Sequence, residues 1–211
     1  MKALSRRGLL HEDVHTVTGE FADQLTVPVL CEGELKFVDC GETRNEKVLI
    51  SGEGCFREHG GLKVLKGNLG QCVIKISAVA PEHHHVKAPC RVFNSQYDVH
   101  KAYQAGELNQ DCVIVVRYAG PAAAGMPELH KLMPVLGNLQ KAGYHVALLT
   151  DGRLSGASGG IPSALHLSPE AAHGGAVALL RDGDIIDFDA DRGEVNCLTS
   201  LEGRTAEVPD L

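Results

Sequence analysis

The residues best suited to chemistry lie in one glycine-rich segment, residues 150–160, which directly follows the apolar run HVALLT. Four glycines in the nine positions from 152 to 160 let the backbone approach a ligand and direct several N–H groups at one spot. Such a turn suits an anion, and the side chains of Arg153, Ser155 and Ser158 would add donors. It has neither the Gly-Lys-Ser/Thr ending of a Walker loop nor the G-x-G-x-x-G spacing of a dinucleotide site.

Residues 156–160, GASGG, also match the G-x-S-x-G pattern of a hydrolase nucleophile. In that motif the serine lies at the turn from a strand into a helix. Ser158 instead lies eight residues past Thr150, and Pro162 follows where the helix should begin. A hydrolase is therefore disfavoured, and a glycine-rich surface turn without chemistry remains the simpler alternative.

A second loop, residues 118–128, joins the apolar run 112–118 to a helix predicted over 127–142. Glu128 would then fall in the first helical turn, where the helix dipole stabilises a carboxylate without any further role. The alternative is a metal ligand, because hard divalent cations prefer such oxygens. Both loops leave the C-terminal ends of strands, where α/β domains tend to build their sites. We expect the two loops to lie side by side at one rim.

The histidines are weaker candidates for a metal or catalytic site than the two loops. In the run HHH at 83–85, alternate residues of an extended segment point opposite ways, which favours a solvated loop over a metal cluster. His130 is two residues from Glu128, and this spacing does not place two side chains on one face of a helix. His59 and His166 are isolated, so a structural role is expected for each.

The seven cysteines do not form a recognisable framework. They are scattered, odd in number and without a C-x-x-C pair, so neither disulfides nor a cluster site is predicted from them. Free cysteines are typical of a reducing cytoplasm. The segment SRRGLL (5–10) resembles a twin-arginine export signal, but HED (11–13) stands where the apolar region would have to be.

The elements that position the two loops are short apolar runs between glycine-rich turns. A helix is predicted over 96–105, after Asn94-Ser95, and another over 127–142, with Pro127 first and a kink or break at Pro134. Asp182-Gly183 indicates a hairpin. The pattern predicts a β-rich α/β domain, a barrel or closed sandwich with helices packed outside. The predicted strands are 62–65, 72–76, 90–93, 112–118, 145–150, 176–180, 184–188 and 195–198.

The first part of the chain differs from the rest. Residues 1–25 are too polar to build a core and are expected to be an arm, and residues 26–58 are expected to form connecting strands and turns before a domain at 59–211. The 211 residues carry 20 Lys+Arg against 27 Asp+Glu, a balance that disfavours nucleic-acid binding through phosphates. No apolar run reaches the ~18 residues of a membrane helix, so no membrane association is expected.

Four segments of the chain stand out as motifs: residues 60–75, 125–134, 148–171 and 174–186. They closely resemble the dihydroxy-acid/6-phosphogluconate dehydratase family and follow the family order. Within them, GMPELHKLMP and SGASG resemble the 6-phosphogluconate branch more than the branched-chain amino-acid branch. GLLHEDVHTV (8–17) resembles the segment that joins the two domains of that family. The resemblance therefore covers nearly the whole chain, but only the C-terminal portion of the family.

The resemblance implies a swivelling β/β/α barrel-like domain preceded by a helical and extended linker arm. It implies dehydration of 6-phospho-D-gluconate to 2-dehydro-3-deoxy-6-phospho-D-gluconate in the Entner–Doudoroff route. Carried over by motif, Ser155 is the base and Glu128 is a ligand of Mg²⁺ or Mn²⁺. The resemblance needs both groups at one metal-proximal site, so Ser155 and Glu128 are expected to face a shared open cleft. A 4Fe-4S cluster is implied as well, with its ligands in an N-terminal domain outside this chain. Arg153, Gly156 and Ser158 are expected to bind the substrate, on the grounds of their chemistry.

The wider expectations are a cytoplasmic enzyme that is a homodimer at full length and needs its N-terminal domain for activity. The absence of the usual family tail after Leu211 favours a fragment. Two alternatives stay open: a dihydroxy-acid or sugar-acid dehydratase of the same family, and a non-catalytic, stand-alone anion-binding module. The retained Ser155 and Glu128 favour an enzyme over the module.

Overall fold

A computed structural model describes residues 1–50, 54–56, 60–155 and 159–209. The chain divides into two compact units, Met1–His59 and Gly60–Leu211, and each is treated by itself. Among the described residues, no helix is long and apolar enough to cross a membrane.

The first unit consists of small, mostly exposed elements. Strand β3 (Thr26–Cys31) pairs antiparallel with β4 (Glu34–Asp39), and the two residues of the turn, Glu32 and Gly33, both have positive φ, as tight hairpins require. Leu25 is the one buried side chain among the residues described in this unit. Connecting strands were expected over residues 26–58, but the apolar run KVLI (47–50) forms none. The remaining elements are α1 (Lys2–Ser5), β1 (His15–Thr16), β2 (Gly19–Glu20) and a 3₁₀ turn, η1 (Phe21–Gln24).

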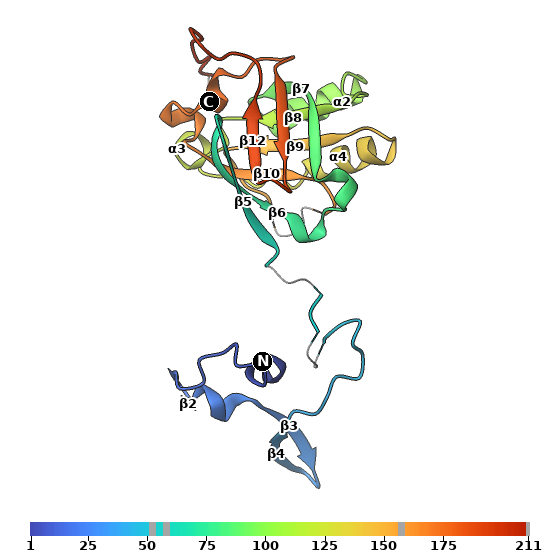
Figure 1. Cartoon of the computed structure of the whole chain (residues 1–211), viewed down its shortest axis with the longest axis vertical. Helices are drawn as coiled ribbons and strands as arrows, with labels where there is room; N and C mark the ends of the chain where they lie inside the picture. The colour runs from blue at the N-terminus through green and yellow to red at the C-terminus, as the bar shows by residue number, and fades with distance from the viewer. Residues whose placement is uncertain (51–53, 57–59, 156–158, 210–211) are drawn as a thin grey trace. The chain divides into compact units, whose positions relative to one another are not determined.

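The second unit is built on a closed eight-stranded barrel (Figure 1). Going round it, the strand order is β10-β6-β5-β12-β11-β7-β8-β9, and β7 to β10 run parallel to one another. The prediction of a strand-rich, mixed α/β barrel is therefore confirmed. The strands are β5 (Leu62–Gly67), β6 (Gly70–Lys75), β7 (His85–Phe93), β8 (Cys112–Val116), β9 (Val146–Thr150), β10 (Ser163–Ser168), β11 (Ile185–Asp189) and β12 (Glu194–Cys197).

Helices α2 (Gln96–Gln104) and α4 (Leu132–Lys141) pack outside the barrel against β8 and β9 (Figure 1). Along β8, Val113 and Val115 point into the barrel core, whereas Ile114 and Val116 pack in the layer under the helices. Both faces of this strand are buried, which explains its unbroken apolar run. The other short helical elements are α3 (Pro121–Ala124), η2 (Ile76–Ala78), η3 (Pro81–His83), η4 (Ala171–His173) and η5 (Ala176–Leu179).

The helix predicted over 96–105 is confirmed, with the Ser95 hydroxyl accepting the Tyr97 N–H at 3.1 Å. The helix predicted over 127–142 is wrong in its first turn, because α4 begins at Leu132. Pro134 is the reason. In a helix starting at 127 its ring would meet the carbonyl of residue 130, whereas in the first turn of α4 its missing N–H costs nothing.

The sequence analysis is also wrong about three elements between residues 163 and 184. Residues 176–180 form η5 rather than a strand, because a short, wholly apolar run is buried equally well in either form. The turn at 181–184 is not a hairpin: it docks on β7, with Gly183 N–H donating to Cys90 O at 2.9 Å. Strand β10 was missed, because its sequence SALHLS lacks a continuous apolar run.

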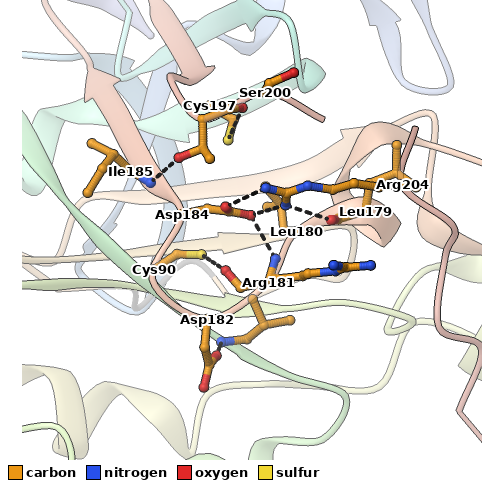
Figure 2. A network of polar contacts seen from close by, with 12 residues as sticks. Cys90, Leu179, Leu180, Arg181, Asp182, Asp184, Ile185, Cys197, Ser200 and Arg204 are labelled. Atoms are coloured by element: carbon orange, nitrogen blue, oxygen red, sulfur yellow. Dashed lines mark hydrogen bonds and ion pairs between the residues drawn. The ribbon is translucent and has the colours of Figure 1, made fainter. Parts of the chain in front are cut away.

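After β12 the chain packs on the barrel again. Leu201 and Ala206 contact the interior core, and Arg204 donates to both carboxylate oxygens of Asp184, at 2.5 and 2.9 Å (Figure 2). Asp184 is almost fully buried and also accepts the Arg181 N–H at 2.8 Å. This ion pair fastens the C-terminal segment to the turn before β11.

Candidate active site

The loops that leave β8 and β9 meet, as predicted. Glu128 and Arg153 form a parallel β-bridge, with Leu129 N–H donating to Arg153 O at 3.3 Å. The Arg153 Nε donates to Met126 O at 2.9 Å. One bridge thus joins the two loops beyond the C-terminal ends of the adjacent parallel strands β8 and β9.

The Glu128 carboxylate lies where the loops join. Its Oε1 accepts the peptide N–H of Ser155 at 2.9 Å and that of His130 at 3.1 Å. The expected place in the first turn of a helix is therefore wrong, and peptide N–H groups rather than a helix dipole stabilise this carboxylate. Nothing in the described chain hydrogen-bonds to Oε2, which leaves this oxygen available.

Ser155 is exposed, and its Oγ lies 3.4 Å from Nδ1 of His130. The spacing argument that set His130 aside assumed a helix at 127–131. In the observed turn, His130 reaches the same spot as Glu128 and Ser155, so the structure brings together a hydroxyl, an imidazole and a carboxylate. Gly156 and Ser158, the other predicted members of the site, lie outside the described residues.

Asp151 connects the two loops through hydrogen bonds from buried peptide groups. It is 1% exposed and accepts the peptide N–H groups of Tyr118 (3.1 Å), Ala119 (2.9 Å) and Ala171 (3.0 Å). Burial raises the pKa of this carboxyl, and the three N–H groups oppose the rise. The sequence analysis gave Asp151 no role. A charged residue directly after a buried strand was the available signal.

Gly152 is required by the closeness of the loops. A Cβ at this position would lie 2.8 Å from the Ala119 Cβ and 3.1 Å from the Ala119 carbonyl oxygen. The glycine therefore permits the approach that the bridge between Glu128 and Arg153 completes.

The other groups singled out earlier lie elsewhere. His84 is buried, with its ring nitrogens within hydrogen-bonding distance of Asp191 Oδ1 (2.8 Å) and Val79 O (3.1 Å), so the predicted solvated loop is wrong for this residue. All seven cysteines are free, and burial raises the pKa of Cys72 and Cys90 to about 12. Within the described ranges, no group of three or more His, Cys, Asp or Glu side chains could hold a metal ion.

Comparison with known proteins identifies the family. Residues 47–209 match the model of the dihydroxy-acid/6-phosphogluconate dehydratase C-terminal domain. The chain is 50% identical to a phosphogluconate dehydratase of Escherichia coli K12 over its whole length, which is 36% of that protein. It is 51% identical to a phosphogluconate dehydratase of Pseudomonas aeruginosa, over 90% of this chain and 32% of that protein.

Sequence identity is lower to a relative that is named for a different activity. A dihydroxy-acid dehydratase of Sulfurisphaera tokodaii is 39% identical over 93% of this chain and 33% of its own length. The chain thus spans about a third of the length of the curated relatives it matches. On these matches, and on a barrel whose paired loops carry the motif residues Glu128 and Ser155, the chain belongs to the dihydroxy-acid/6-phosphogluconate dehydratase family as its C-terminal domain.

Proposed function

We propose that this chain is the C-terminal domain of a phosphogluconate dehydratase, which converts 6-phospho-D-gluconate to 2-dehydro-3-deoxy-6-phospho-D-gluconate and water. The observation that carries the proposal is the hydrogen bond from the Ser155 peptide N–H to Glu128 Oε1, which joins the loops that follow two parallel strands. The relatives favour this substrate, because the sequence of this chain is 45–51% identical to phosphogluconate dehydratases and 39% identical to a dihydroxy-acid dehydratase.

The reaction breaks two bonds, C2–H and C3–O, and forms an enol that tautomerises to the 2-keto acid. In the proposal, Ser155 acts as an alkoxide, and its Oγ takes the proton from C2 to become a hydroxyl. A serine hydroxyl is too weak an acid to ionise unaided at neutral pH, so forming the alkoxide needs a nearby cation and hydrogen-bond donors. His130 Nδ1, 3.4 Å away, would help to orient the hydroxyl.

Glu128 fits the role of a metal ligand. Two peptide N–H groups fix its Oε1, and Oε2, which has no hydrogen bond to the described residues, would be available as a single carboxylate ligand for Mg²⁺ or Mn²⁺. One carboxylate is too few to hold such an ion, so the remaining ligands would come from elsewhere in the full-length enzyme. A 4Fe-4S cluster, with its ligands also outside this chain, would supply a Lewis acid for the departing C3 hydroxyl.

Arg153 is proposed to bind an anionic end of the substrate. Its Nε is engaged by Met126 O, while its two terminal nitrogens make no hydrogen bond to the described part of the chain. Gly156 and Ser158 are proposed to add donors to the same group, on the sequence argument alone.

The proposal extends to the setting of the domain. The barrel would swivel against an N-terminal domain, the full-length enzyme would be a cytoplasmic homodimer, and neither nucleic acid nor membrane would be a partner. The Met1–His59 unit would include the linker to that N-terminal domain.

The test is Ser155→Ala in the full-length enzyme, with formation of the 2-keto acid as the assay. We expect turnover to fall by at least ~100-fold, since a positioned base contributes on that order, with fold and cluster content unchanged. Ser200→Ala, on the exposed C-terminal segment, is the matched control and should keep wild-type turnover. The isolated chain should be inactive. Wild-type rates in Ser155→Ala, or turnover by the isolated chain, would refute the proposed mechanism.

A further inference from the structure

A cavity of about 230 Å³ lies beside the candidate active site. It is enclosed by the loop after β8, the start of the loop after β9, and the segment from β10 into η4. Met126, in its wall, is two residues before Glu128, and Asp151, also in its wall, is four residues before Ser155. The lining residues are Pro121, Met126, Asp151, His166, Leu167, Ser168, Pro169, Glu170 and His173.

Strained backbone gathers at this cavity. Of the four non-glycine residues with positive φ in the described chain, Met126 (φ 60°) and His166 (φ 56°) line it. A third, Tyr118 (φ 59°), donates its N–H to Asp151 in the wall. This conformation is unfavourable for a residue that has a Cβ, and such conformations concentrate at ligand-binding and catalytic sites.

His166 is the residue of this lining with the most distinctive position. It lies at an irregularity in the pairing of β10 with β6, between Leu165 and Ser168, and such bulges re-aim side chains beside active sites. Its peptide N–H donates to Gly152 O at 3.0 Å, which ties it to the loop that carries Ser155. Its imidazole is exposed and makes no hydrogen bond within the described residues, so both ring nitrogens are available.

The fixed charges of the cavity decide between ligand chemistries. Asp151 and Glu170 are both almost fully buried, and both are held by peptide N–H groups, Glu170 through the Ala122 N–H at 3.1 Å. His173 lies 3.3 Å from Glu170. Two carboxylates in the wall disfavour a phosphate dianion, whereas hydroxyl groups can both donate to carboxylates and pair with an imidazole.

We propose that this cavity binds the hydroxylated chain of the sugar acid, the carbons beyond the two that react, with His166 as the hydrogen-bonding side chain. The choice of a sugar acid rests on the proposed function. The volume is below the ~300–1,000 Å³ of sites that enclose a whole ligand, which suits one part of such a substrate. The phosphate is then held outside the cavity.

The test uses the 211-residue chain, uniformly isotope-labelled, and NMR titration with D-gluconate, 6-phospho-D-gluconate and inorganic phosphate. We expect both sugar acids to shift the His166 imidazole resonances in a saturable way, and inorganic phosphate to leave them in place. His166→Asn assigns the signal and removes the imidazole. Asparagine tolerates positive φ, so the backbone should be kept.

Gluconate affinity, followed at the amides of Gly152 and Ser168, should fall about three- to tenfold in His166→Asn, the cost of one hydrogen bond. His85→Asn is the control, at the opposite end of the parallel strands, and should bind as wild type. A His166 shift produced by inorganic phosphate alone, or none with either sugar acid, would overturn the inference. Binding needs no turnover, so this result is independent of the Ser155→Ala assay.

Discussion

Two buried aspartates organise the irregular segments of the barrel unit, and their surroundings give them opposite pKa shifts. Among the described residues, Asp151 accepts hydrogen bonds from peptide N–H groups alone, and burial raises its pKa. Asp184 is also buried, but the Arg204 guanidinium and the Arg181 N–H outweigh burial and hold its pKa below the usual value. Asp151 thus holds the loops of the candidate site through peptide groups, whereas Asp184 is a charged anchor for the C-terminal segment (Figure 2).

The Asp184 anchor should make the stability of the barrel depend on pH. A carboxyl whose pKa is lower in the folded than in the unfolded chain stabilises the fold above about pH 4, and this contribution is lost as the pH falls through the folded pKa. Asp184→Asn should lower the free energy of unfolding by roughly 1–3 kcal/mol at neutral pH, measured by urea denaturation.

That deficit should shrink as the pH is lowered from 7 to about 3, because the wild type loses the same charge. Asp98→Asn is the control, since its ion pair with Lys101 is exposed and should contribute little at any pH. A deficit that stays constant over this range would contradict the ionic anchor.

At the scale of elements, the sequence predicted those with an unbroken apolar run or a helix cap and failed where a proline or a local bulge interrupts the pattern. The Ser95 cap and the apolar run of β8 were read correctly. The start of α4 was not, although Pro134 marked it, and β10 was hidden because His166 interrupts its apolar pattern. The bulge at His166 arises from pairing with β6, a contact between distant segments that local sequence does not encode.

The candidate site divides in the same way. Two arguments predicted that the loops after β8 and β9 would meet: both leave buried strands, and the family resemblance needs Ser155 and Glu128 at one site. The roles proposed for Ser155 and Glu128 came from the family resemblance. The proximity of His130 and the bracing by Asp151 depend on the turn between Glu128 and α4 and on the segment around Ala171, neither of which has a sequence period.

The close approach of the two loops can be tested with a pair of glycines. Gly152→Ala places a Cβ 2.8 Å from that of Ala119, so it should destabilise the chain by about 1–3 kcal/mol and reduce turnover in the full-length enzyme. Gly137→Ala, inside α4, has nothing within 4 Å of the new Cβ and should stabilise by roughly 0.5–1 kcal/mol. Thermal unfolding of both variants checks the pair. A neutral Gly152→Ala would mean that the loops are not packed as described.

At the scale of the whole molecule, the two units differ in what they can bury. The barrel closes on itself and therefore leaves no open sheet edge, and the β7-to-β10 side carries a second apolar layer under α2 and α4. The first unit has the hairpin β3–β4, on which Leu30, Leu35 and Phe37 are all more than 60% exposed. An isolated two-stranded hairpin is marginally stable in water at best.

The barrel unit should therefore fold without the first unit. We expect residues 60–211, expressed alone, to give a cooperative thermal transition within a few degrees of that of the 211-residue chain, because every buried apolar side chain described except Leu25 lies in this part. Residues 1–59 alone should show no cooperative transition, since they lack a core whose burial could offset the conformational entropy lost on ordering. Circular dichroism at increasing temperature distinguishes the outcomes. If residues 60–211 melt far below the full chain, the first unit contributes stabilising contacts to the barrel, and the barrel is not an independent folding unit.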